Sequence, residues 1–424
     1  MGYSDWIKCK ISDLGEIVSG GTPSTKNIEN WVGEISWITP KDLSGYKSRF
    51  VSTGERKISS KGLANSSAKL MPKGSVLFSS RAPIGYVAIA SNELSTNQGF
   101  KSIVTNKHNY NIFVYYLLKY ITDDIKRIAG GSTFSEISGT AFKNIDITIP
   151  GLNKQKAIAD ILSSLDDKIE LNQKINKNLE DIAQTLYKRW FVDFEFPNEE
   201  GLPYKSSGGE MVDSELGLIP KGWEVKTVGE IRIFNKRGIS PKYTTNIDGI
   251  PVINQRCIRN HTIVEEAVQY HDLKAKNFHT DYFHNSWDVL VNSMGVGTLG
   301  RVSISSKSHT KLVHSCITIL RTNEEQLLKP LFAYMILSFE KKFIEMGEGT
   351  TGQTSLNNKL IDNISMILPS MMIQKKLANT IQSLQEKIDN NYSEIEKLSK
   401  IRDLLLPKLM NGEIEVPVGN NHGA

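Results

Sequence analysis

The chain has 424 residues, enough for two or three domains, and its 39% hydrophobic and 23% charged residues are ordinary for a soluble protein. It has no apolar run of membrane-span length, no signal-peptide core and no CxxC pair among its three cysteines, so we expect a cytoplasmic protein with reduced thiols. A net charge of +5 and a pI of about 8.8 permit nucleic-acid binding without indicating it.

The first 150 residues have the pattern of a strand-rich domain. Short β-branched runs alternate with Gly, Pro, Asn and Ser, as in ISWITP, VLFSS, GYVAIA and KSIVT. Such punctuation is typical of strands joined by turns. Within this domain a helix is expected from Ile112 to Ile128.

A long helix is predicted from Lys154 to Trp190, because this segment contains neither Pro nor Gly and its apolar residues recur at spacings of four and three. It would be about 55 Å long. We expect Asp166, Asp167 and Glu170 on its solvated outer face. The predicted seam is interrupted by two asparagines and contains Ile158, Leu162, Leu165, Ile169, Asn172, Asn176, Leu179, Ala183, Leu186 and Trp190.

The second half of the chain repeats the first. A shift of 219 residues moves Gln155 onto Gln374 and Asn172 onto Asn391, and upstream VLFSSRAPIGYVAI resembles VLVNSMGVGTLGRVSI. The repeated helix spans Gln374 to Met410. Its predicted seam contains Leu377, Ile381, Leu384, Ile388, Asn391, Leu398 and Leu405.

Two repeated halves predict an α+β fold with two α/β domains separated by two long helices, which form an antiparallel coiled coil with pseudo-two-fold symmetry. In such a pair Asn172 and Asn391 should face each other as a polar layer that fixes the register. The alternative, which the spacing leaves equally open, is that both asparagines are solvated at a slightly skewed seam. The predicted parts are a first domain at 1–150, a helix at 151–196, a connector at 197–219, a second domain at 220–369, a helix at 370–411 and a tail at 412–424.

The connector RWFVDFEFPNEEGLPYKSSGGEMVDSELGLIPKGWE resembles the centre of the specificity subunit of type I restriction–modification systems. GGTPST (20–25), ISWITPKDL, STNQGF (95–100) and GGSTFSEIS resemble loops of the recognition domains in that family. The resemblance covers almost the whole chain. In the second copy, however, the Thr-Asn-Gln-Gly-Phe loop is replaced by Val313-His314-Ser315-Cys316.

The resemblance implies a non-catalytic subunit with two target-recognition domains, each of which reads one half of a bipartite DNA target. The helices would set the spacing between the half-sites and dock two modification (methyltransferase) subunits, which use S-adenosylmethionine to methylate adenine. Restriction (motor–nuclease) subunits would add ATP and magnesium. No cofactor and no metal are expected in this chain itself.

Base reading in the major groove needs Arg, Asn and Gln on loops, while phosphates are bound by Lys, Arg, Ser and Thr. Any one such residue could equally be a solvated side chain or a turn cap. In the first domain the candidates are Thr22, Ser24, Thr25, Lys26, Lys41, Ser79, Ser80, Arg81, Asn97, Gln98, Ser132, Thr133 and Ser135. In the second they are Lys236, Arg237, Lys242, Asn254, Gln255, Arg256, Arg259, Asn292, Ser293, Arg301, Thr350, Thr351 and Gln353.

Enzyme motifs find little support. Gly295–Gly300 matches GxGxxG but is followed by a strand-like run rather than the helix of a dinucleotide site, so we expect a glycine-rich hairpin. Gly347–Thr354 has Gln353 where a phosphate-binding loop needs lysine. Two other functions remain open: the recognition subunit of a related bipartite-target restriction system of type IIB/IIG, and a coiled-coil scaffold with two protein-binding lobes.

Overall fold

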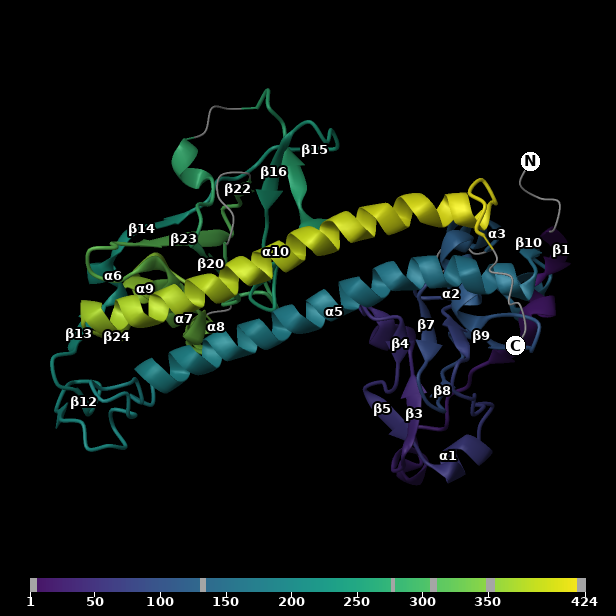
Figure 1. The fold of residues 1–424 in the computed structure, drawn as a ribbon, viewed down its shortest axis with the longest axis horizontal. Helices are drawn as coiled ribbons and strands as arrows, with labels where there is room; N and C mark the ends of the chain where they lie inside the picture. The colour runs from purple at the N-terminus through teal and green to yellow at the C-terminus, as the bar shows by residue number, and fades with distance from the viewer. Residues whose placement is uncertain (1–5, 130–134, 276–278, 306–310, 348–354, 418–424) are drawn as a thin grey trace. The chain divides into compact units, whose positions relative to one another are not determined.

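The computed structural model describes residues 6–129, 135–275, 279–305, 311–347 and 355–417. The chain divides into two compact units, one made of residues 1–174 and 392–424 and the other of residues 175–391. Each unit holds one strand-rich lobe and a part of each of two long helices (Figure 1). We call residues 6–150 the first lobe and residues 220–369 the second lobe.

The first lobe is built on a five-stranded sheet in the order β2-β9-β6-β7-β4, beside a three-stranded sheet β5-β3-β8 and the pair β1-β10. Its strands are β1 (Trp6–Lys10), β2 (Gly15–Ser19), β3 (Ile35–Ile38), β4 (Phe50–Val51), β5 (Arg56–Ile58), β6 (Val76–Phe78), β7 (Val87–Ala90), β8 (Ser95–Thr96), β9 (Lys101–Thr105) and β10 (Asp146–Pro150). Its helices are α1 (Ser60–Ala64), α2 (Asn111–Tyr120), α3 (Thr122–Ile128) and α4 (Gly139–Lys143), with short 3-10 turns at 11–14, 28–31 and 40–43.

The helix predicted from Ile112 to Ile128 is interrupted at Ile121, between α2 and α3. The Thr122 hydroxyl donates to the Leu118 carbonyl at 2.6 Å, a side-chain bond that competes with the helix backbone. Six consecutive residues of α2, Phe113 to Leu118, are buried. They pack between the sheet and the long helices, together with Ile158 and Leu162.

The second lobe repeats this plan with a four-stranded sheet β14-β23-β20-β21, a second sheet β15-β19-β16-β22 and the pairs β13-β24 and β17-β18. Its strands are β13 (Glu224–Thr227), β14 (Arg232–Arg237), β15 (Tyr243–Thr244), β16 (Ile250–Ile253), β17 (Ile258–Arg259), β18 (Thr262–Ile263), β19 (Gln269–His271), β20 (Val289–Asn292), β21 (Val302–Ile304), β22 (Leu312–Val313), β23 (Ile317–Thr322) and β24 (Ser365–Leu368). Its helices are α6 (Val228–Ile231), α7 (Lys329–Ser338), α8 (Glu340–Gly347) and α9 (Asn358–Asp362), with 3-10 turns at 265–267 and 280–282. The connector before it contains the antiparallel pair β11 (Met211–Val212) and β12 (Ile219–Pro220).

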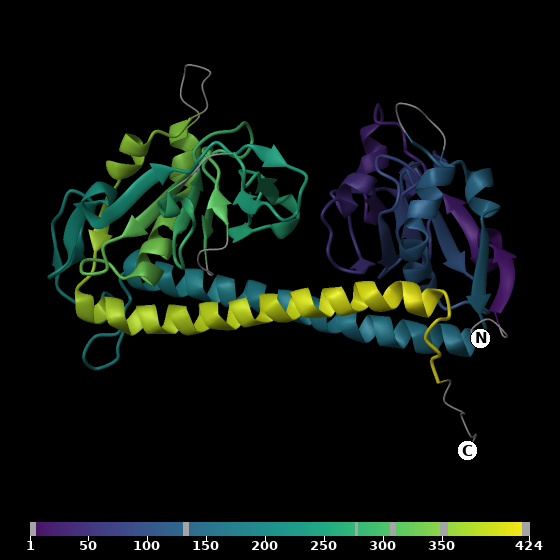
Figure 2. The same cartoon turned by 90° about the horizontal axis from the view of Figure 1, so that it is seen from above.

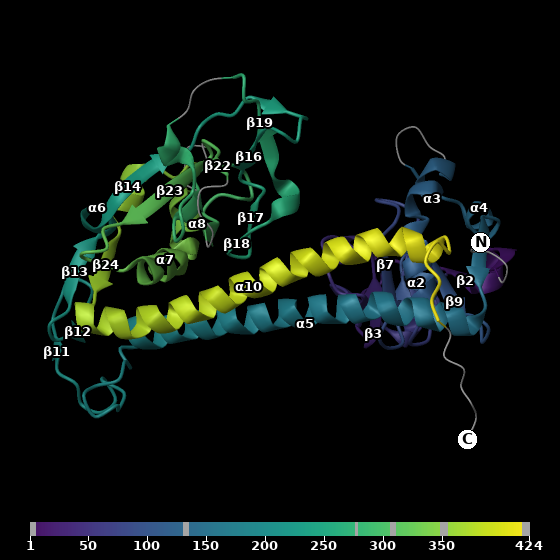
Figure 3. The same ribbon diagram turned by 45° about the horizontal axis from the view of Figure 1, so that its top comes forward.

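Helix α7 lies between the four-stranded sheet and the long helices, as α2 does in the first lobe (Figure 3). The expected glycine-rich hairpin is present, because β20 and β21 are antiparallel neighbours joined through Gly295–Gly300. The connector is ordered against this lobe. Phe196 stacks on Tyr204 and on Trp223, with ring centroids 4.6 and 5.0 Å apart.

The long helices are α5 (Leu152–Phe191) and α10 (Met371–Met410), each of 40 residues. They run antiparallel and side by side (Figures 1 and 2). In the first unit Leu162 joins the same core as Leu405 and Leu409, and in the second unit Ala183 joins that of Leu377 and Ile381. All the predicted seam residues are buried or half-buried. The predicted fold class is therefore confirmed.

The predicted pairing of Asn172 with Asn391 is wrong by one helical turn. Asn391 donates to Asn176 Oδ1 at 2.7 Å, and Asn176 donates to the Ile388 carbonyl at 3.2 Å. Asn172 instead donates to Glu394 at 2.8 Å. All three asparagines are nearly fully buried, so they form polar layers in the seam.

One buried glutamine at the start of each long helix anchors it to its lobe. Gln155 accepts the Tyr110 N–H at 2.9 Å and donates to the Pro150 carbonyl at 2.9 Å. Gln374 does the same with the Leu328 N–H (3.0 Å) and the Pro369 carbonyl (3.0 Å). The helix start, the last strand of the lobe and the start of α2 or α7 are thus joined by one side chain in both repeats.

Candidate nucleic-acid interface

The loop at residues 20–26 is held from behind by the side chains of buried or half-buried residues. The indole N–H groups of Trp37 and Trp31 donate to the Gly21 carbonyl (2.9 Å) and the Ser24 carbonyl (3.2 Å). A Cβ on Gly20 would lie 2.0 Å from the Asn97 carbonyl oxygen, so this position requires glycine. The loop is fixed at its backbone, which leaves four exposed candidate side chains, those of Thr22, Ser24, Thr25 and Lys26.

A side-chain hydrogen bond joins this loop to the Asn97–Gln98 loop. The Thr22 hydroxyl donates to Gln98 Oε1, and both side chains are exposed. Asn97 faces the other way, because its Oδ1 accepts the Gly99 N–H at 2.9 Å and closes the turn. Gln98 therefore presents its amide NH₂ to solvent, whereas Asn97 is a turn residue.

Arg81 lies beside this pair of loops. Its guanidinium is 3.4 Å from the Glu136 carboxylate, and both side chains are about 40% exposed, at 36% and 41%. The charges of both residues act on the neighbouring Lys101. Burial lowers the pKa of Lys101, Glu136 raises it and Arg81 lowers it, and the net shift is downward. Two cations and one carboxylate at a partly exposed edge make a basic spot suited to a phosphate or a base edge.

Ser79 and Ser80, the neighbours of Arg81, are fully buried. The Ser79 hydroxyl donates to the Pro83 carbonyl at 2.7 Å and accepts the Tyr86 N–H at 2.8 Å. The prediction that these two serines contact DNA is wrong, because neither has exposed surface. They shape the turn that carries Arg81.

The predicted DNA contacts of three candidates in the second lobe are also wrong, because their side chains are buried. Asn254, Asn292 and Ser293 are 2% exposed or less. Asn254 donates to the Ala267 carbonyl (2.9 Å), and Asn292 to the Gln255 carbonyl (3.0 Å). These side chains satisfy buried backbone groups, a use that a residue-type argument cannot distinguish from base reading.

Among the candidate cations of the second lobe, Lys236, Lys242, Arg256 and Arg259 are exposed. Arg259 ends β17, and the next two residues, Asn260 and His261, both have positive φ (48° and 61°), as a tight two-residue hairpin requires. His261 is 3.5 Å from Glu340 and 3.3 Å from Gln184 of α5. The contacts of His261 therefore hold the tip of the hairpin that carries Arg259. Gln255 and Arg301 are half-buried, and Arg301 donates to the Gly297 carbonyl at 2.8 Å.

Sequence analysis missed Ser240, Ser315 and His314. The Ser240 and Ser315 hydroxyls lie 3.1 Å apart. His314 Nδ1 accepts the Cys316 N–H at 2.9 Å, and burial lowers the pKa of His314, so the imidazole is held neutral. The sequence offers two signals: the Gly-x-x-Pro spacing shared by 20–23 and 238–241, and the Val313–Cys316 segment that stands where the first copy has its Thr-Asn-Gln-Gly-Phe loop.

Lys41 forms an exposed ion pair with Glu55 at 2.8 Å, and Ser135 is exposed. Five other candidates, Ser132, Thr133, Thr350, Thr351 and Gln353, lie outside the described residues.

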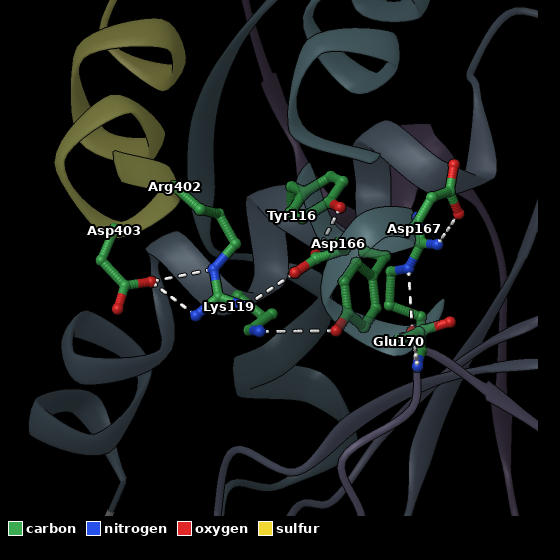
Figure 4. Close-up of polar contacts among 9 residues, drawn as sticks. Tyr116, Lys119, Asp166, Asp167, Glu170, Arg402 and Asp403 are labelled. Carbon is green, nitrogen blue, oxygen red and sulfur yellow. Dashed lines mark hydrogen bonds and ion pairs between the residues drawn. The ribbon is translucent and has the colours of Figure 1, made fainter. Parts of the chain in front are cut away.

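Where the first lobe meets the long helices, a polar cluster takes in carboxylates of α5 that were expected on its solvated face (Figure 4). Asp166 is 3% exposed; it accepts the Tyr116 hydroxyl at 2.6 Å and Arg402 at 2.7 Å. Burial alone would lower the pKa of Arg402, but Asp166 and Asp403 outweigh it and raise the pKa. Asp167 and Glu170 also turn to the lobe, where both pair with the buried Arg49. The prediction that these carboxylates face solvent is therefore wrong for Asp166, which is buried, and for Glu170, whose side chain is 24% exposed, whereas the Asp167 side chain is 69% exposed, as expected.

Comparison with known protein families identifies the family to which the two repeated lobes belong. The family model for the type I restriction modification DNA specificity domain matches twice, at residues 3–181 and 220–400, and each match contains one lobe and much of the following long helix. The chain belongs to the type I restriction–modification specificity subunits. The unit of duplication in this family model is thus the lobe together with its helix.

Relatives cover nearly the full chain. The type I restriction enzyme MjaIX specificity subunit of Methanocaldococcus jannaschii is 38% identical over 97% of this chain and 94% of its own length. The HindI specificity subunit of Haemophilus influenzae is 27% identical over 84% of this chain and 89% of its own. A crystal structure of the type I restriction–modification S subunit from M. genitalium has the same fold, with a TM-score of 0.58 over 96% of both chains and 18% identity. Among the described residues, no helix is both long and apolar enough to cross a membrane.

Proposed function

We propose that this cytoplasmic, non-catalytic subunit confers DNA sequence specificity on a type I restriction–modification complex, each lobe reading one half of a bipartite target. The observation that carries the proposal is the duplication itself. Both lobes present an exposed, backbone-anchored pair of loops that carries hydroxyl or amide groups, with a guanidinium close by. Loops that are held rigid lose less conformational entropy when they bind DNA.

The division of labour follows from the chemistry of the exposed groups. Lys26, Lys242 and Arg256 are suited to phosphates, which supply affinity that falls with salt. Gln98 and Arg81 are suited to base edges, where forked donors distinguish one base pair from another. The long helices would set the spacing and bind two modification subunits, which use S-adenosylmethionine. Restriction subunits would use ATP with magnesium.

The test is adenine methylation mapped across a genome in cells that carry this chain with its modification subunit. We expect methylation at one motif made of two short half-sites with a fixed gap. Deleting the gene for this chain should abolish the methylation, because the modification subunit would then have no target. Methylation without sequence preference would contradict the proposal and would favour a protein scaffold.

A further inference from the structure

The corresponding loops of the two lobes have the same pattern of backbone hydrogen bonds although their sequences differ. Four backbone hydrogen bonds, each from the N–H of the first residue to the carbonyl of the second, occur in both lobes. In the first lobe they are Gly21–Thr96 (2.9 Å), Asn97–Ile38 (2.9 Å), Ser80–Gly99 (2.7 Å) and Ile137–Ser80 (3.1 Å). In the second lobe the corresponding bonds are, in the same order, Ile239–Val313 (2.9 Å), His314–Ile253 (2.9 Å), Ser293–Cys316 (2.9 Å) and Leu356–Ser293 (2.9 Å). His314 closes its turn through Nδ1 as Asn97 does through Oδ1, each at 2.9 Å. The Val313-His314-Ser315-Cys316 segment is therefore the equivalent of Thr96-Asn97-Gln98-Gly99.

These correspondences match residues between the lobes one by one. Thr22 matches Ser240 and Gln98 matches Ser315, so the hydrogen bond that joins the loops is present in both lobes. An isolated β-bridge between Arg81 and Glu136 matches one between Met294 and Ser355. The second lobe thus has methionine where the first has its guanidinium.

The second lobe places a guanidinium at the same point from the end of a strand, whereas Arg81 lies in the turn after β6. Arg237, the last residue of β14, donates to Ser355 Oγ and the Leu356 carbonyl, both at 3.1 Å, and to Met294 Sδ at 3.4 Å. Its counterpart in the first lobe is Ser19, the last residue of β2, since Ser19 pairs with Lys101 and Arg237 with Thr318 in matching strands. The charge thus comes from a turn in the first lobe and from the end of β14 in the second, while its position beside the matching bridge is kept.

We propose that Arg81 and Arg237 are equivalent specificity-determining residues, each of which contacts the half-site read by its own lobe beside the loop pair Thr22–Gln98 or Ser240–Ser315. This inference rests on the proposed function. A guanidinium in this place can donate a fork to guanine or to phosphate, and the adjoining pair differs in chemistry. Gln98 offers an amide donor, whereas Ser240 and Ser315 offer hydroxyls, so the two lobes are expected to prefer different bases at this point.

The test moves the guanidinium of the first lobe to the second lobe's position. Arg81→Met should weaken discrimination at one position of one half-site by about 10- to 100-fold and leave the other half-site unchanged. The graft Ser19→Arg, Arg81→Met, Lys101→Thr and Glu136→Ser copies the four matching residues of the second lobe and should restore discrimination. Both proteins are assayed in the reconstituted methyltransferase complex by competitive binding and by sequencing of methylated random duplexes.

The outcomes separate this inference from the proposed function. If the parent complex selects a bipartite motif but Arg81→Met leaves both half-sites unchanged, Arg81 is not a specificity residue and the inference is overturned. If the folded graft, judged by an unchanged melting temperature, does not restore discrimination, the equivalence of Arg81 and Arg237 is overturned. If the parent complex selects no motif, the proposed function fails as well. Gln326→Ser, an exposed substitution in the loop before α7, should change none of these readouts.

Discussion

Asp362 ties α9 to β14 in the second lobe. Arg232 donates to both of its carboxylate oxygens, at 2.9 and 2.8 Å, and Asn235 adds a third bond at 2.8 Å. Burial raises the pKa of Asp362, but the hydrogen bonds from Arg232 and Asn235 outweigh it, so the net shift is downward. A carboxyl whose pKa is lowered by folding stabilises the protein above its unfolded pKa of about 3.9. That contribution disappears as the pH falls through the folded pKa.

We therefore expect Asp362→Asn to lower the free energy of unfolding by about 1.5–3 kcal/mol at pH 7, because three bonds to a charged group are weakened. The difference from the parent protein should shrink as the pH falls below about 4. Urea denaturation at both pH values measures it. Asp124→Asn, which removes an exposed ion pair with Arg127, should cost at most about 0.5 kcal/mol. If Asp362→Asn lowers the free energy of unfolding equally at both pH values, the charge of Asp362 is not the source of its stabilising effect.

The two long helices differ at the element scale despite their repeat. Arg402 and Asp166 form a buried ion pair between α10 and α5, with side chains 19% and 5% exposed. The residues that match them under the repeat are Ala183 and Gln385. Charge therefore joins the helices in the first unit, where the corresponding positions of the second unit are neutral. Periodicity places Asp166 beside the seam, but only the docked Tyr116 and Arg402 explain its burial.

Replacing these residues by their repeat counterparts tests the pair. Arg402→Ala should cost about 3–5 kcal/mol, since it leaves a buried carboxylate without its cation. Asp166→Gln in the same chain should recover part of that loss, so the double variant should be more stable than the sum of the single effects predicts. Denaturation of all four proteins gives the coupling energy. Lys400→Ala, in an exposed pair with Glu396, serves as the control. Additive losses would show that the two charges do not interact.

At the scale of the whole molecule, helix length becomes a functional quantity under the proposed function. One heptad adds about 10 Å to a helix, which corresponds to about three base pairs of duplex. Seven residues inserted into both helices, after Asn172 and after Asn391, should lengthen the gap between the half-sites by about that amount and leave the half-sites themselves unchanged.

Methylation mapping of this insertion variant reads the gap directly. The same heptad inserted after Glu200, in an exposed turn of the connector, should leave the gap unchanged. If the helix insertion yields the original gap, the helices serve only as a docking surface for the other subunits.

The sequence by itself determined the repeat, the two long helices, their seam and the family, because hydrophobic periodicity and turn chemistry are local properties of the chain. Only the tertiary structure decided which polar residues are exposed. Ser79, Asn254 and Asn292 have side chains fit for DNA, yet they satisfy buried backbone groups.

The register of the two long helices and the equivalence of Arg81 and Arg237 also became apparent only from the tertiary structure. The partner of Asn391 is Asn176, one helical turn from the predicted Asn172. Arg237 ends β14 and Arg81 lies in the turn after β6, so no alignment of the two repeats pairs them. Contacts between residues far apart in the chain depend on how strands and helices pack together, and residue type and spacing alone do not specify that packing.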